Sequence, residues 1–293
     1  MATEVNQTAA CCAQFYETDW VQTILGESFH PGGIQLTDRL LGSLNIEPGE
    51  QLLDVACGLG TTSMFASNKY QANITGVDFS ETNVQRANEA ASEKGANIQF
   101  KTGDAAKLPV EDNSVDHLVC ECAVSTFADQ PAVVGEFYRV LKSGGSLAIS
   151  DMVLNGALPE KIEAILAPWT CLASAKNVAG YQRLFLDSGF AVTSYDDESE
   201  SLLQLIIDLK KKLLVAGLGK TLSTADGVPD MLASLNIGEI KELLDESRRL
   251  VKEGVVQYCR ITFAKDKPVS KAKPAPLPVS QINSSDCGPN CDC

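Results

Sequence analysis

The stretch LLDVACGLGTTSMFA, residues 52–66, decides the fold of this chain. An apolar run that predicts a strand passes directly into an Asp-x-x-x-Gly-x-Gly segment, which in turn opens a predicted helix. Gly58 and Gly60 carry no side chain, so the backbone at this turn can come close to a ligand. The stretch therefore predicts the first strand–turn–helix unit of an α/β sheet, with a ligand site at the turn.

An acidic residue ends the next predicted strand. Asp78, in GVDFS, follows Gly60 by 18 positions. In a right-handed parallel βαβ unit it projects into the same crevice, where its carboxylate can accept hydrogen bonds from a ribose diol. This pair is equally typical of nicotinamide-dependent oxidoreductases, so it does not by itself identify the cofactor.

Alternating strand and helix patterns extend outward from this unit. Strand-like runs alternate with helix-like segments in the order LLDVA, ANITGVD, NIQFKTGD, VDHLVCE and GGSLAISDMV. Ser80 is a predicted N-cap for a helix over 81–94, and Asp129 for a helix over 130–142 that ends before Gly144. The alternation predicts an open, mostly parallel α/β sheet.

Three regions are expected along the chain: an ordered aromatic extension with a helix, a main domain, and a disordered tail rich in Pro, Ser and Lys, at residues 1–47, 48–265 and 266–293. Late in the main domain we expect helical segments that cover the substrate at 153–187 and 199–253, and strands at 189–197 and 255–264. The two helical segments lie outside the alternating unit, so they would select the acceptor.

Composition limits the functional classes. The chain has 293 residues, 44% hydrophobic and 21% charged, which is typical of a globular protein. A net charge of −14 argues against nucleic acid or an anionic membrane as the main partner, because both would repel it. Without an apolar span or a signal-like start we expect a cytoplasmic protein, with its ten cysteines present as thiols or soft-metal ligands. The expected partner is a small molecule or metalloid, and the oligomeric state stays open.

Further motifs separate the cofactor alternatives. Asp54 precedes the glycines, and Ser63 stands where a dinucleotide fold prefers a third glycine, which disfavours a nicotinamide enzyme. Together with DVACGLG and GVDFS, the segments GDAAKLP, SVDHLVCE and RVLKSGG make an ordered set over about residues 50–152 that resembles the class I S-adenosylmethionine-dependent methyltransferases. The same core is also similar to quinone and sterol methyltransferases.

The resemblance implies a Rossmann-like sheet of seven strands with the last strand antiparallel, and S-adenosylmethionine as cofactor. It also implies positions around that cofactor. The methionine end would be lined by Asp54, Ala56, Gly58 and Gly60 with Glu121 nearby, the ribose held by Asp78, and the adenine contacted by Phe79, Asp104 and the backbone of Ala105.

The N-terminal extension is expected to contribute a lid. His30 lies in SFHPGG, and this Pro-Gly-Gly turn beside Tyr16 and Trp20 could close over the cofactor. We therefore include Tyr16 among the cofactor-binding residues and His30 as a pocket or proton-transfer residue. His117, early in a strand, is expected to be a core residue.

Cysteine placement suggests the acceptor. Cys171 lies in PWTCLASAKNVAGYQRLFLDSGF, which resembles a stretch of the arsenite methyltransferases. Trivalent arsenic is soft and prefers thiolates, so Cys171 is a candidate catalytic ligand. The chain has no cysteine near position 220, where a second ligand would be expected. Tail cysteines could compensate, because some 26 residues of coil reach about 25–30 Å; they are Cys287, Cys291 and Cys293.

Cys122 is a further candidate catalytic residue. Strand alternation would put Cys120 and Cys122 on one face, with Cys122 nearer the pocket, whereas Cys57 is expected to pack in the core. The best substrate hypothesis is a thiol-bound trivalent metalloid such as arsenite. Methylation of an oxygen, nitrogen or carbon of a small metabolite, and a non-catalytic soft-metal-binding protein, remain the alternatives.

Overall fold

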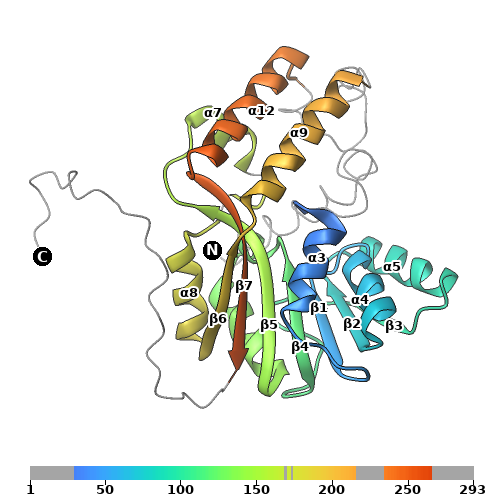
Figure 1. The fold of residues 1–293 in the computed structure, drawn as a ribbon. Coiled ribbons are helices and arrows are strands. Elements are labelled where there is room, and N and C mark those ends of the chain that lie inside the picture. The colour runs from blue at the N-terminus through green and yellow to red at the C-terminus, as the bar shows by residue number, and fades with distance from the viewer. Residues whose placement is uncertain (1–29, 168–169, 173, 216–233, 266–293) are drawn as a thin grey trace, which may run out of the picture.

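The computed structural model describes residues 30–167, 170–172, 174–215 and 234–265 (Figure 1). Seven strands form one sheet in the order β3-β2-β1-β4-β5-β7-β6, in which only β7 runs antiparallel to its neighbours. This confirms the predicted mostly parallel, seven-stranded sheet with an antiparallel last strand. The strands are β1 Gln51–Val55, β2 Asn73–Asp78, β3 Ile98–Thr102, β4 Val115–Glu121, β5 Leu141–Leu154, β6 Phe190–Asp197 and β7 Val256–Lys265.

Helices cover both faces of the sheet. They are α3 Gly33–Gly42, α4 Thr61–Tyr70, α5 Glu81–Glu93, α6 Gln130–Val140, α7 Glu160–Ile165, α8 Val178–Asp187, α9 Ser199–Val215 and α12 Ile237–Lys252, with a short 3-10 turn, η1, at Val124–Thr126. Phe137 of α6 and Phe185 of α8 pack in the same buried cluster as Leu118 of β4. Leu40 of α3 and Ala66 of α4 pack with Leu52. Helices α7, α9 and α12 gather beyond one end of the sheet (Figure 1).

Local sequence determines the helix ends. The Ser80 hydroxyl accepts the Asn83 N–H at 3.0 Å, and Asp129 accepts the Ala132 N–H at 3.0 Å, so both predicted caps are confirmed. Helix α6 stops at Val140, two residues before the predicted end at 142, because the next residue already pairs with Val115 in the sheet.

The stretch 153–187 is less helical than predicted. Strand β5 continues to Leu154, one residue beyond the predicted strand GGSLAISDMV, and pairs there with Val256. Within the described part of this stretch, helix occupies α7 and α8. Among the described residues, no helix is both long and apolar enough to cross a membrane.

The strand order creates a natural site. Strand β1 lies between β2 and β4, so the chain moves outward in opposite directions on its two sides. The loops that follow β1 and β4 therefore diverge at their carboxyl ends, which is the position where ligands bind in open α/β sheets. The glycine turn after β1 and the residues after β4 both lie at this position.

Candidate functional site

The turn after β1 has the backbone that its glycines predicted. Ala56, Gly58 and Gly60 adopt positive φ angles of 59°, 53° and 76°. A β-carbon at Gly60 would lie 2.4 Å from the ring of Phe100, so no larger residue fits there. Ala56 is a non-glycine residue held in the left-handed region, a strain typical of functional turns.

Asp78 connects this turn to the end of β2. Its carboxylate accepts the Gly58 N–H at 2.8 Å and the Ser80 N–H at 2.9 Å, and it is 8% exposed. The adjacent Phe79 is 45% exposed, which is unusual for a large aromatic residue and leaves its ring accessible beside the turn. The structure thus brings together the glycines and the acid that the sequence singled out.

Asp104 and Ala105 follow β3 in a short turn. Asp104 is exposed and accepts the Ala106 N–H at 2.8 Å, while Ala105 is buried. Because β3 and β2 are parallel neighbours, this turn lies at the same sheet edge as Asp78. An exposed carboxylate there is available to a ligand.

Asp54, the last but one residue of β1, is a buried carboxylate. The Ser63 hydroxyl donates to it at 2.7 Å. Burial raises the pKa of Asp54 to about 7; the Ser63 hydrogen bond opposes this rise, and the charges of Glu121 and Asp78 add to it. The sequence noted Ser63 only as a missing glycine, and its partnership with Asp54 depends on the helix turn that follows.

Side chains of α3, of α4 and of the turn before α3 contact Glu121, at the end of β4. It accepts the Thr62 hydroxyl of α4 at 2.7 Å and the Thr37 hydroxyl of α3 at 3.1 Å. His30 Nε2 lies 3.4 Å from the Glu121 carboxylate and 3.3 Å from the Thr37 hydroxyl. The side chains of His30 and Glu121 are only 9% and 6% exposed. The expected pocket position of His30 is therefore next to Glu121.

Sequence reasoning missed Thr37 and Thr62, because single hydroxyls on helices belong to no recognisable motif.

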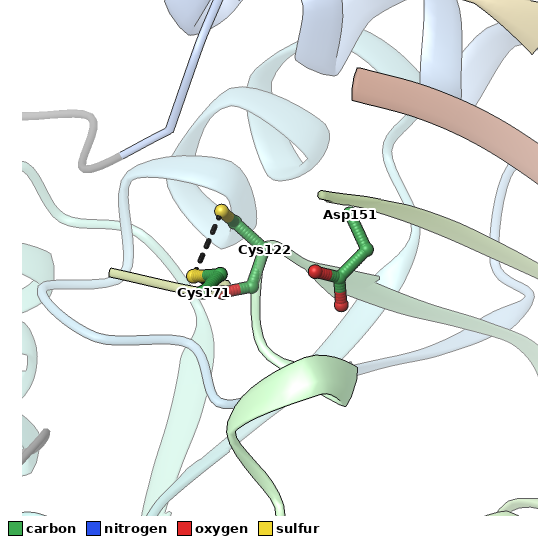
Figure 2. A group of neighbouring side chains, drawn as sticks. All are labelled: Cys122, Asp151 and Cys171. Carbon is green, nitrogen blue, oxygen red and sulfur yellow. Dashed lines mark hydrogen bonds between the residues drawn. The ribbon is translucent and has the colours of Figure 1, made fainter. Parts of the chain in front are cut away.

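Two cysteines from distant segments lie in contact (Figure 2). The Cys122 thiol donates to the Cys171 sulfur at 3.1 Å, and the Cys171 thiol donates to the Cys122 carbonyl at 2.9 Å. Cys171 is 3% exposed. The pKa of the Cys122 thiol is raised well above its ordinary value, most strongly by the hydrogen bond with Cys171 and next by burial. Cys122 is therefore held as a protonated thiol that donates to Cys171.

The predicted shared face of Cys120 and Cys122 is wrong. Strand β4 ends at Glu121, and Cys122 takes a left-handed φ of 52°, so the alternation stops before it. Cys120 is fully buried in the core under α6 and α8, whereas Cys122 packs with the apolar group under α9 and α12. The strand end redirects Cys122 toward Cys171.

A buried carboxylate adjoins the thiol pair. One ligand atom each from Cys122, Asp151 and Cys171 lie within 4.8 Å of one another. Burial raises the pKa of Asp151 to about 6, although hydrogen bonds from Ser125 and from backbone N–H groups oppose the rise. Sequence reasoning missed Asp151; its signal was a lone charge within the apolar run LAISDMV of a predicted central strand.

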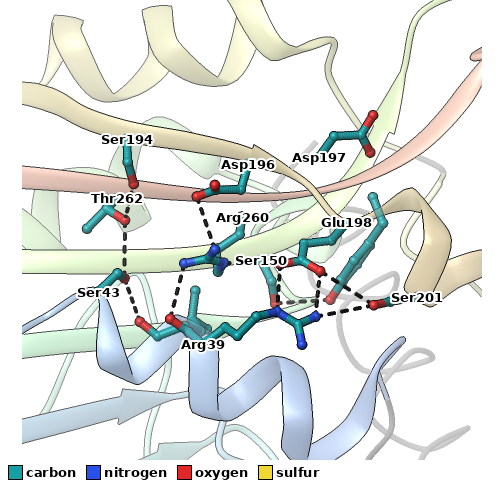
Figure 3. A network of polar contacts seen from close by, with 12 residues as sticks. Arg39, Ser43, Ser150, Ser194, Asp196, Asp197, Glu198, Ser201, Arg260 and Thr262 are labelled. Carbon is teal, nitrogen blue, oxygen red and sulfur yellow. Dashed lines mark hydrogen bonds and ion pairs between the residues drawn. The ribbon is translucent and has the colours of Figure 1, made fainter.

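Ion pairs fix α3 to β7 and to the residues before α9 (Figure 3). Arg39 donates to both oxygens of Glu198, at 3.1 and 2.6 Å, and Arg260 donates to the same carboxylate at 3.3 Å. Burial favours protonation of Glu198, but the two guanidinium groups outweigh it and lower the pKa of that carboxyl. Helix α3, which presents Thr37, is thereby tied to β7 and to the start of α9.

The remaining candidates from the sequence are Tyr16, the three tail cysteines, His117 and Cys57. Tyr16, Cys287, Cys291 and Cys293 lie outside the described residues, so their roles stay predictions. His117 lies at the opposite end of β4, where its ring nitrogens contact Glu50 at 2.8 Å and Ser146 at 2.7 Å. Cys57 is buried and packs with Phe100, as expected for a core residue.

Residues 46–205 match the family described as "Methyltransferase domain", more than half of the chain. Among curated relatives, phosphoethanolamine N-methyltransferase 1 of Arabidopsis thaliana is 27% identical over 63% of this chain and 38% of its own length. The arsenite methyltransferase of Halobacterium salinarum is 30% identical over 53% of this chain and 40% of its own length. The chain thus matches well under half of the length of these relatives.

A solved structure shares the fold. Phosphoethanolamine N-methyltransferase 2 of Haemonchus contortus, in complex with phosphomonomethylethanolamine and S-adenosylhomocysteine, superposes with a TM-score of 0.70 and 19% identity. The match covers 84% of this chain and 56% of that one. At this identity the likeness concerns the fold.

Proposed function

The chain belongs to the methyltransferase domain family and has the class I fold, and from this we propose that it transfers a methyl group from S-adenosylmethionine to a small acceptor. When bound, S-adenosylmethionine supplies a methyl group on a positively charged sulfur, already activated for transfer. The protein has to hold this cofactor, align the acceptor and exclude water.

The turn after β1 fits such a cofactor. Its glycines allow close approach of the backbone, and the buried carboxylate of Asp54 suits a cationic ligand, because a nearby positive charge would offset its burial. In this proposal Asp78, which bonds to the glycine turn, binds the ribose hydroxyls, and the accessible ring of Phe79 contacts the adenine. Asp104 and the backbone of Ala105 would complete the adenine side, and Glu121 the methionine side.

The acceptor that the geometry supports best is a trivalent metalloid such as arsenite, and the observation that carries this proposal is the contact between the sulfurs of Cys122 and Cys171. The sequence contains Cys171 but no cysteine near position 220 that could act as a second sulfur ligand. Cys122 fills that role from the end of β4. Two soft sulfurs at 3.1 Å can chelate one trivalent centre.

Capture of the metalloid by this pair is chemically balanced. With arsenous acid, two arsenic–sulfur bonds form and two arsenic–oxygen bonds break, and the two thiol protons leave in two molecules of water. Arsenic remains trivalent and keeps its lone pair, which is the nucleophile for methyl transfer. The tail cysteines Cys287, Cys291 and Cys293 stay candidates for a third ligand.

The test follows methyl transfer from isotopically labelled S-adenosylmethionine to arsenite in the presence of reduced glutathione. We expect methylated arsenic from the wild-type chain and a loss of at least 100-fold in Cys171→Ser and in Cys122→Ser, because one thiol cannot chelate. Cys259→Ser is the matched control, since Cys259 is a buried thiol of the core cluster that includes Phe185. Equal activity in all four proteins would overturn the metalloid proposal.

A small organic acceptor is the second candidate. The relatives named as phosphoethanolamine N-methyltransferases favour it, and the His30–Glu121 pair could accept a proton from an amine or hydroxyl. In that case Cys171→Ser would leave turnover of the organic acceptor unchanged, whereas His30→Ala would reduce it. A soft-metal-binding protein without catalysis would show no S-adenosylmethionine binding at all.

A further inference from the structure

The cluster of Cys122, Asp151 and Cys171 allows two interpretations (Figure 2). All three side chains could ligate one divalent metal, because thiolate and carboxylate groups are both common ligands. Alternatively, the two thiols are the binding groups and the carboxylate has another task. The hydrogen bonds of Asp151 decide between these interpretations.

The oxygens of Asp151 are already engaged. Oδ1 accepts the Ser125 hydroxyl at 2.6 Å and the Met152 N–H at 2.7 Å, and Oδ2 accepts the Ser125 N–H at 2.9 Å. A carboxylate has about four acceptor sites, and these three hydrogen bonds occupy most of them. A metal that displaced these donors would leave them buried and unpaired, at a cost for each.

These contacts hold the turn that carries Cys122. Ser125 is 1% exposed and lies in η1, directly after Cys122 and Ala123. The Cys122 N–H donates to the Ser150 carbonyl at 2.7 Å, so the turn is tied to β5 at two consecutive residues, Ser150 and Asp151. A left-handed φ at a cysteine is strained and persists only where the surroundings enforce it.

We propose that Asp151, acting through Ser125, is the positioning residue that holds the Cys122 turn so that the two sulfurs form a ready-made bidentate site for a soft trivalent ligand. This role extends the proposed metalloid function, and the identity of the natural ligand rests on that function. Asp151 does not itself touch the ligand. Among its described residues the site therefore supplies two ligands, the sulfurs of Cys122 and Cys171. The third ligand of a bound trivalent centre comes from the bound molecule itself.

The experiment measures binding of phenylarsine oxide, which captures two neighbouring thiols, to the reduced full-length protein. Its hydrated form loses two hydroxides as two arsenic–sulfur bonds form, and the thiol protons leave as water. Binding by Cys171→Ser is subtracted as background from the other cysteines. Cadmium binding and S-adenosylmethionine binding are measured in parallel, together with the melting temperature of each variant.

We expect arsenoxide affinity to fall at least tenfold in Asp151→Asn and at least fivefold in Ser125→Ala, with S-adenosylmethionine affinity unchanged. Ser125→Ala removes one hydroxyl and keeps the backbone contacts, so it reports the role even if Asp151→Asn folds poorly. Ser146→Ala is the matched control, because its hydroxyl on β5 contacts His117 at the other end of the sheet.

Two results would overturn the proposal. One is unchanged arsenoxide affinity in both variants. The other is loss of cadmium from Asp151→Asn with arsenoxide affinity intact, which would make Asp151 a metal ligand. Failure of the wild-type protein to methylate arsenite while these affinities change as expected would reject the proposed acceptor and leave the positioning role standing.

Discussion

At the residue scale, Asp54 shows a conflict between stability and ligand binding. Asp54 is 2% exposed, and the Ser63 hydroxyl, its side-chain donor among the described residues, does not offset the loss of water. A residue that is costly in the ligand-free fold and faces the proposed cofactor site is typical of a functional group.

Replacing Asp54 with Asn should stabilise the protein at high pH. The folded-state pKa of Asp54 is raised from 3.8 to about 7, so the folded state binds more protons than the unfolded state between these values. Stability from this group is present below pH 4 and is lost as pH rises to 7, on the order of 4 kcal/mol over the window. In urea unfolding, the gain of Asp54→Asn over wild type should be larger at pH 8 than at pH 5. A gain independent of pH would contradict this assignment.

Gly60→Ala should both destabilise the chain and weaken cofactor binding. A positive φ costs a non-glycine residue about 1–2 kcal/mol, and the new β-carbon would also overlap the Phe100 ring, for a total of roughly 3 kcal/mol. Gly144→Ala is the control, since Gly144 has φ of 78° but nothing within 4 Å of a β-carbon. Calorimetric melting should show a clearly larger loss for Gly60→Ala; equal losses would argue against the steric contribution.

At the element scale, the caps and turns agreed with the sequence, whereas the start of β5 did not. Ser80 and Asp129 cap their helices because the cap contacts lie within three residues. Strand β5 begins at Leu141, before the predicted run GGSLAISDMV, because Leu141 pairs with Val115 of β4, and no local pattern reveals this pairing. At its other end β5 forms a long antiparallel ladder with β7.

Glu198→Ala should loosen α3 from β7 and from the start of α9. The change leaves the guanidinium of Arg260, which is 12% exposed, without one of its two carboxylate partners. Because Arg39 is 45% exposed and well screened, we expect a loss of about 2 kcal/mol, below that of a fully buried pair. Arg183→Ala is the control, since its pair with Asp187 is exposed on both sides and should contribute less than about 0.5 kcal/mol. Similar unfolding curves for both variants would refute a structural role of this network.

At the scale of the whole molecule, cofactor binding should stabilise the fold. A ligand that binds only the folded state adds about 2.7 kcal/mol at a concentration 100-fold above its Kd, which corresponds to a melting shift of roughly 5–10 °C at this size. S-adenosylmethionine should produce this shift in the wild-type chain and a much smaller one in Asp78→Asn. Asp187→Asn, on the surface of α8, should respond like wild type. No shift in the wild-type chain would reject the proposed cofactor site.

The sequence by itself determined the sheet, its parallel units, the glycine turn and the acid that bonds to it, because these depend on strand periodicity, glycine geometry and short βα spacing. Only the tertiary structure brought Cys122 to Cys171, Asp151 to Ser125, and His30, Thr37 and Thr62 to Glu121. Those contacts join residues 26 to 91 positions apart, or pass through a strand end where side-chain alternation breaks down. The order of the strands and the direction of the backbone at the carboxyl edge of the sheet determine these contacts, and a local sequence pattern predicts neither.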